Sequence, residues 1–186
     1  MPVDRRQRQF HSRTHASQVL EGIDLSGKIF AITGTTSGIG VETARALVLK
    51  NAHVVMINRN LKESENLKNK LLLERPNAQI DIIQCDLNCL ASVQNAAEKY
   101  LEKKWKLHGL ILNAGVFGPT TKTTSDGYEA HFGINHLAHF IKQGALSFLC
   151  VSHQKTSTSH DSAQNHCREM IVSSNFKEIT VSLIIF

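Results

Sequence analysis

The sequence predicts an α/β fold built on a doubly wound parallel sheet. From residue 28 onward, short runs of apolar and β-favouring residues alternate with segments whose apolar residues recur at helical spacing. The runs follow one another at intervals of roughly 25–30 residues, which leaves room for one helix in each connection. Strands joined in this way pair in parallel through right-handed crossovers. We therefore expect the strand order 3-2-1-4, with a fifth strand beside the fourth.

The strands are predicted from their apolar character and the turn residues around them. Five runs fit: 28–33, 53–57, 78–84, 109–112 and 170–173. A helix follows the first run because four apolar residues there share one helical face: Val41, Ala44, Leu47 and Val48.

The other helices have start and stop signals of their own. Asn60, with Glu63 three residues later, is a capping pair for a helix over 61–74, which the following proline ends. A third helix follows Ser92, with apolar residues at amphipathic spacing. A fourth is predicted from Asp126 to about residue 149.

The chain of 186 residues is long enough for one sizeable core, so we expect one folded unit in three parts. These are a basic extension over 1–27, a nucleotide-binding region over 28–149, and a divergent stretch over 150–186. The last holds a polar loop, the fifth strand and an apolar tail from Val181 to Phe186. We expect that tail to have no partner, and the fifth strand to present an unpaired edge.

Composition excludes several classes of protein. No apolar run approaches the ~18–20 residues that span a bilayer, and no secretory signal is recognisable. Four arginines in the first 13 residues carry much of the net charge of +5. We interpret them as a solvated tail and expect no nucleic-acid partner, with an address signal or a polyanion contact as the alternative. We expect a cytoplasmic protein, with mitochondrial or nuclear association left open. The cysteines and histidines lack metal-ligand spacing, so no metal site is expected.

A glycine-rich loop follows the first strand and opens the first helix. Gly34 permits the tight turn, Gly38 lets the backbone approach a pyrophosphate, and Gly40 lets the helix pack close to the sheet. The free N–H groups at the start of the helix attract negative charge. This loop therefore predicts a dinucleotide site.

Four segments resemble the motifs of the short-chain dehydrogenase/reductase family. Thr33 to Gly40 (TGTTSGIG) resembles its TGxxxGxG motif, and three later segments follow in family order: Cys85-Asp86-Leu87, Asn113-Ala114-Gly115, and Asn135 to Phe140 (NHLAHF). The resemblance covers about residues 14–145. It implies a Rossmann-type fold, cut short at its C-terminal side in this sequence.

The resemblance also implies roles for individual residues. Asp86 would hydrogen-bond the adenine, with Leu87 beside it, and Asn135 would steady the active-site helix and a proton-relay water. The pyrophosphate would lie against Gly34, Ser37, Gly38, Ile39 and Gly40. The adenosine and ribose side would be lined by Asn113, Ala114 and Gly115.

The end of the second strand bears on cofactor choice. NAD-specific sites usually place an acid there to bind the ribose 2′-hydroxyl, whereas this chain has Ile57-Asn58-Arg59. A guanidinium can pair bidentately with a 2′-phosphate, so NADP(H) is favoured over NAD(H). The alternative is that Arg59 only solvates the end of the strand.

The family's catalytic set is incomplete in this sequence. Ser174 matches its serine, but the tyrosine and lysine expected four apart beyond that serine are absent. Tyr100 and Lys104 have the right spacing but precede Asn113, and we interpret Tyr100 as a core residue. Two hypotheses stand. One is an oxidoreductase acting on a hydrophobic alcohol or carbonyl, such as a retinoid or steroid. The other is a catalytically inactive form that acts through nucleotide binding or protein contacts.

Overall fold

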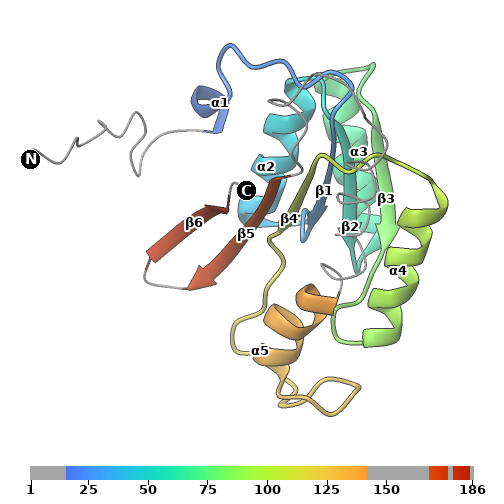
Figure 1. Cartoon of the computed structure of the whole chain (residues 1–186), viewed down its shortest axis with the longest axis vertical. Helices are drawn as coiled ribbons and strands as arrows, with labels where there is room; N and C mark the ends of the chain where they lie inside the picture. The colour runs from blue at the N-terminus through green and yellow to red at the C-terminus, as the bar shows by residue number, and fades with distance from the viewer. Residues whose placement is uncertain (1–15, 142–167, 176–177, 185–186) are drawn as a thin grey trace, which may run out of the picture.

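The computed structural model describes residues 16–141, 168–175 and 178–184 (Figure 1). Its strands form one sheet in the order β3-β2-β1-β4-β5-β6. They are β1 (Ile29–Thr33), β2 (His53–Asn58), β3 (Ile80–Gln84), β4 (Gly109–Leu112), β5 (Arg168–Asn175) and β6 (Glu178–Ile184). The first five pair in parallel, which confirms the predicted order 3-2-1-4-5.

Helices connect the strands as predicted. The described helices are α1 (Ala16–Val19), α2 (Gly38–Leu49), α3 (Leu61–Glu74), α4 (Leu90–Glu102), α5 (Ala130–Phe132) and the π-helix η1 (Gly133–Leu137). The Asn60 side chain accepts a hydrogen bond from the backbone of Glu63, which confirms the capping pair of α3. No helix of the described residues is long and apolar enough to cross a membrane.

The core has two layers, one on each face of the sheet. Successive residues of β2 belong to different layers: Val54 packs with α2 and α3, whereas Val55 packs with α4. Figure 1 shows α4 on the opposite side of the sheet from α2. Because both faces of the central strands are covered, their sequences are continuously apolar rather than alternating. The carboxyl ends of these strands are left to form the site.

Two sequence-based predictions were wrong. The apolar tail has a partner, because β6 pairs antiparallel with β5, with Val172 opposite Val181. Only two residues separate these strands, and a connection that short allows antiparallel pairing. The helix predicted from Asp126 begins at Ala130, with Glu129 as its N-cap. Residues 124–127 form a turn instead, closed by a bond from the Gly127 N–H to the Thr124 carbonyl. The predicted continuation over 142–149 lies outside the described residues.

Candidate functional site

The glycine loop between β1 and α2 adopts a conformation that requires glycine. Gly34 has φ +70° and Gly38 has φ +57°, both in the left-handed region. A Cβ on Gly34 would lie 2.7 Å from the Cα of Ala114, so the loop after β4 passes directly against the glycine loop. A Cβ on Gly38 would meet nothing within 4 Å. Gly38 therefore faces open space, where a ligand can approach the backbone.

Asn113 joins the ends of β1 and β4. Its Nδ2 donates to the backbone oxygens of Gly34 at 2.9 Å and Thr33 at 3.1 Å. The hydroxyl of Thr33 accepts in return from the backbone N–H groups of Asn113 and Ala114, both at 3.0 Å. The glycine loop and the Asn113–Gly115 turn are thus held as one unit.

A second polar network, not predicted from the sequence, joins the loop to β2. Asn58 accepts from the Thr35 N–H at 2.8 Å, and its Nδ2 donates to the Thr35 hydroxyl at 2.7 Å and to Ser64 at 2.9 Å. All three residues are buried. The sequence contains only a weak signal for this network. Asparagine is common at strand ends, and its bonding partner cannot be identified from the sequence.

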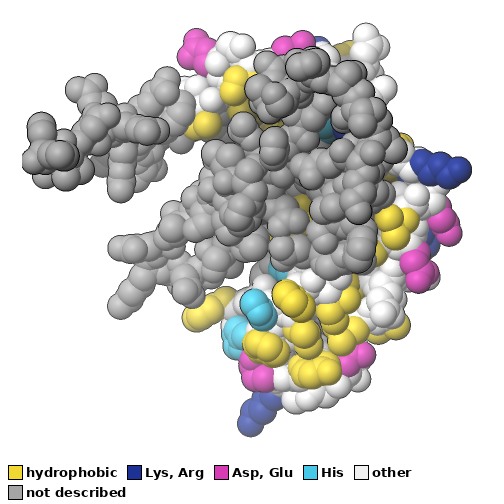
Figure 2. Space-filling model, in the orientation of Figure 1, with side chains coloured by type: hydrophobic (Ala, Val, Ile, Leu, Met, Phe, Trp, Pro, Cys, Tyr) yellow, Lys and Arg dark blue, Asp and Glu magenta, His cyan; other side chains and the backbone are white. Residues whose placement is uncertain are grey.

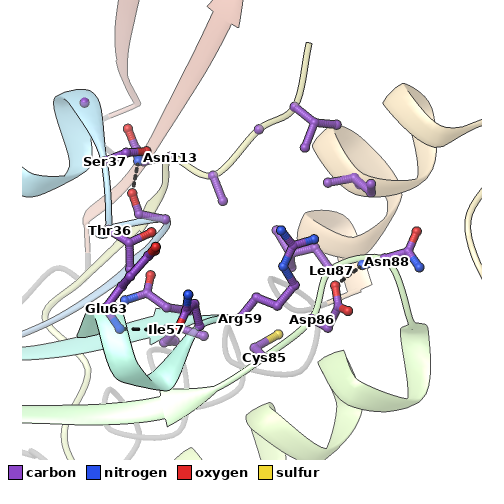
Figure 3. Close-up of a pocket in the computed structure, with 18 of the residues that line it drawn as sticks. Thr36, Ser37, Ile57, Arg59, Glu63, Cys85, Asp86, Leu87, Asn88 and Asn113 are labelled. Carbon is purple, nitrogen blue, oxygen red and sulfur yellow. Dashed lines mark hydrogen bonds between the residues drawn. The ribbon is translucent and has the colours of Figure 1, made fainter. Parts of the chain in front are cut away.

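These segments surround a pocket of about 600 Å³, shown in Figure 3. Ten of the predicted cofactor-binding residues line it: Gly34, Ser37, Gly38, Ile39, Arg59, Asp86, Leu87, Asn113, Ala114 and Gly115. Gly40 is not among the lining residues. It lies behind the loop, where a Cβ would meet the carbonyl of Gly34. The structure thus brings this whole predicted set together at one end of the sheet.

Charged side chains lie on the β2–β3 side of this pocket. Arg59 is exposed at the end of β2, and Figure 3 shows it extending toward Asp86 and Leu87. Glu63, in the first turn of α3, also lines the pocket and was not singled out from the sequence. The sequence indicated only its capping role at the start of α3, so Glu63 was not predicted as a pocket residue. Among the described residues, the lining of the pocket thus includes one cation, Arg59, and two carboxylates, Glu63 and Asp86.

The predicted catalytic residues, Asn135 and Ser174, lie on different elements. Asn135 sits in η1, where its side chain accepts from the Val116 N–H at 2.8 Å and donates to the Val116 carbonyl at 2.9 Å. Ser174 lies in β5, with its backbone opposite Ile179, and its side chain is outside the described part. Tyr100 is fully buried among α4 core residues and does not line the pocket, in agreement with its interpretation as a core residue.

The segment that carries Asn135 also exposes aromatic side chains. Figure 2 shows hydrophobic and histidine side chains gathered over α5. The His136 ring is stacked with Phe140 and lies tilted against Phe132. Among the residues described, no group of histidine, cysteine and carboxylate side chains could hold a metal ion.

Comparison with known proteins gives one family. The family model for short chain dehydrogenase matches residues 28–156. WW domain-containing oxidoreductase from Gallus gallus is 40% identical over 132 residues, 71% of this chain and 32% of that protein. Retinol dehydrogenase 12 from Mus musculus is 37% identical over 135 residues, 73% of this chain and 42% of that protein. The chain thus spans about a third to two fifths of the length of these relatives.

Solved structures share the fold. A metagenomic short-chain oxidoreductase, solved in complex with NADP, superposes with a TM-score of 0.60 at 24% identity. The match covers 70% of this chain and 59% of that one. The fold of the described sheet and helices is therefore one that known oxidoreductases use.

Proposed function

The chain belongs to the short-chain dehydrogenase family, and on that premise we propose that its pocket binds a nicotinamide dinucleotide, with NADP(H) preferred over NAD(H). The observation that carries this proposal is the convergence of ten predicted cofactor-binding residues on one pocket. The glycine loop leads into the N-terminus of α2, whose first backbone N–H groups are donors for a pyrophosphate.

The fit of the pocket to a dinucleotide rests on two features of α2. The Ser37 side chain makes no capping bond, so it does not occupy the N–H groups of the first turn. Gly38, next to it, has open space where a side chain would stand. A phosphate placed there meets free donors, the positive end of the helix and no steric obstacle.

The preference for NADP(H) rests on Arg59. It is the cation at the end of β2 that lines the pocket, at the place where NAD-binding sites carry an acid. Glu63 and Asp86 line the same side and would repel a 2′-phosphate that lay close to them. We therefore assign the phosphate to the Arg59 guanidinium, which can pair with it bidentately. Asp86 is assigned to the adenine.

For the reaction, we propose the oxidoreductase chemistry of the family, acting on a hydrophobic alcohol or carbonyl. This chemistry requires the serine, tyrosine and lysine of the family's catalytic set. The relatives of this chain include a retinol dehydrogenase, which supports this substrate class. When bound, the dinucleotide supplies or accepts the hydride. Within this chain, Asn135 holds the Val116 segment that borders the pocket, and Ser174 is assigned to the substrate oxygen.

The second candidate function is dinucleotide binding without turnover by the 186-residue chain. It is favoured by the tyrosines: the chain has two, Tyr100 is buried in the core, and Tyr128 is followed four residues later by Phe132 rather than lysine. Positioned acid–base catalysis typically contributes ~10²–10⁴-fold, and its absence would leave turnover near background.

Steady-state assays separate the two functions. NADPH oxidation with retinal and NADP reduction with retinol should stay at background in protein that binds NADPH. Turnover would favour the first function for this chain as it stands. Turnover abolished by Tyr100→Phe alone would show that Tyr100 acts in catalysis after all.

A further inference from the structure

His139 is a buried titratable residue that does not line the pocket. It lies in the helical residues 138–141 that follow η1, and it is 6% exposed. Its Nε2 is 3.2 Å from the hydroxyl of Thr33, and its Nδ1 is 3.1 Å from the backbone oxygen of Asn135. The ring therefore connects the end of β1 to the π-helix.

The hydrogen bonds with Thr33 and Asn135 favour one tautomer of the ring. The Thr33 hydroxyl already accepts from two backbone N–H groups, those of Asn113 and Ala114. Because a hydroxyl has two acceptor positions and one proton, Thr33 must donate that proton to Nε2 of His139. The carbonyl of Asn135 can only accept, so Nδ1 must carry the ring proton. These two bonds therefore favour the Nδ1–H tautomer of His139.

Two partners of His139, Thr33 and Asn135, bind opposite ends of the same pocket segment. Thr33 binds the backbone at Asn113 and Ala114, where the segment begins. Asn135 binds the N–H and the carbonyl of Val116, where it ends. The whole of 113–116 lines the pocket. The His139 ring does not line the pocket. It joins Thr33 and Asn135, which hold the two ends of the 113–116 segment of the pocket wall.

We infer that His139 is a positioning residue for dinucleotide binding, which acts by joining Thr33 and Asn135 so that the 113–116 segment keeps the shape the ligand needs. This inference rests on the proposed function, because it assigns a purpose to a pocket wall of the same site. The π-helix supports it, since such turns often mark functional positions.

Three substitutions in the full chain separate the two bonds. His139→Phe keeps a ring and loses both bonds. His139→Asn places an amide donor near the position of Nδ1 and loses the hydrogen bond with Thr33. His139→Gln reaches the position of Nε2 and can accept from Thr33. We expect NADPH affinity, measured by titration calorimetry, to fall roughly five- to thirty-fold in His139→Phe, and also to fall, by a smaller factor of about two- to ten-fold, in the two variants that keep one bond each.

Two controls separate positioning from general destabilisation. His136→Phe makes the same chemical change on the exposed side of the helix and should leave NADPH affinity unchanged. Leu71→Val makes a small cavity in the α2–α3 core layer, so it should lower thermal stability without affecting NADPH affinity. Equal loss of affinity in Leu71→Val and His139→Phe would overturn the inference in favour of a merely structural role.

The remaining outcomes distinguish this inference from the proposed function. Wild-type protein that binds neither dinucleotide would refute the proposed function, and the inference with it. Wild-type affinity in His139→Phe would refute the inference alone, as would wild-type affinity in both His139→Asn and His139→Gln, because neither variant joins Thr33 to Asn135. The ¹⁵N spectrum of His139 gives a readout without ligand. A protonated Nδ1 with an unprotonated Nε2 is expected, and the opposite tautomer would contradict the hydrogen-bond assignment.

Discussion

Gly40 in helix α2 packs directly against Gly34 in the loop that precedes the helix. A Cβ on Gly40 would overlap the Gly34 carbonyl oxygen and lie 2.6 Å from Nδ2 of Asn113, the donor that binds this carbonyl. Because the nearest atom is a backbone oxygen, the clash could be relieved only by moving the backbone. The absence of a side chain on Gly40 therefore sets the distance between helix and sheet, and with it the shape of the pocket.

Gly40→Ala should separate α2 from the glycine loop. We expect a loss of about 1–3 kcal/mol in the free energy of unfolding, as for other overpacked sites, together with loss of NADPH binding. Urea denaturation and calorimetric titration measure the two effects. Gly22→Ala is the matched control, because a Cβ there meets nothing within 4 Å and only the positive φ is strained. It should cost about 1–2 kcal/mol and leave binding intact.

Arg59→Asp should reverse the preference between NADPH and NADH. Loss of a charge-assisted bidentate contact costs ~1.5–3 kcal/mol, or about ten- to a hundred-fold in Kd for NADPH. Glu63→Gln should do the opposite and tighten NADPH binding, because it removes a negative charge from the same side of the pocket. The ratio of the two dissociation constants is the measured quantity. An unchanged ratio in Arg59→Asp would mean that Arg59 only solvates the strand end.

Because of the N-cap of α5, the free energy of unfolding should decrease at acid pH. The backbone N–H groups of Phe132 and His131 donate to the Glu129 carboxylate, with the His131 side chain adding to their effect, and they lower its pKa from 4.5 to about 2. The folded state thus binds the proton less readily than the unfolded state. The contribution of this cap is complete above pH 4.5 and is lost as the pH falls toward 2.

Urea midpoints between pH 6 and pH 2.5 test this effect. Glu129→Gln should lose less stability than wild type over the acid part of the range. Glu98→Gln, the same change at an exposed position in α4, should follow the wild-type curve. Parallel curves for wild type and Glu129→Gln would contradict the capping assignment.

Tyr100→Phe should be neutral or stabilising. The Tyr100 hydroxyl is buried and has no hydrogen-bond partner within the described part of the chain, and burial raises its pKa. Its ring packs edge-on against Trp105 at 5.6 Å, a contact that phenylalanine keeps. Removing an unsatisfied hydroxyl is expected to raise the free energy of unfolding by up to about 1 kcal/mol. A loss larger than about 1 kcal/mol would indicate a hidden partner. Tyr128→Phe, at an exposed tyrosine, is the control.

The central sheet could be predicted because its strands are buried on both faces. Continuous apolar runs such as 53–57 leave little choice of element, and the helices between them impose parallel pairing. The start of α5 was misplaced because Asp126 and Glu129 are both acidic residues suited to a helix start. The choice between them depends on a turn that Thr124 and Gly127 close in space.

The geometry of the glycine loop could be predicted because its motif has one geometric purpose. Gly34 and Gly38 have positive φ as the loop requires, and Asn113 reaches back to the loop. The contacts of Asn58 and His139 were not predicted. Their importance depends on partners 23 and 106 residues away, and no local spacing records such contacts.

Titration of the purified 186-residue chain with NADPH and with NADH, followed by isothermal calorimetry, measures whether the pocket beside Gly34 and Arg59 is a dinucleotide site. We predict one saturable site, with a dissociation constant about ten- to a hundred-fold lower for NADPH than for NADH. Equal affinities would contradict the role of Arg59. The absence of binding by either dinucleotide to folded protein would contradict the proposed function as a whole.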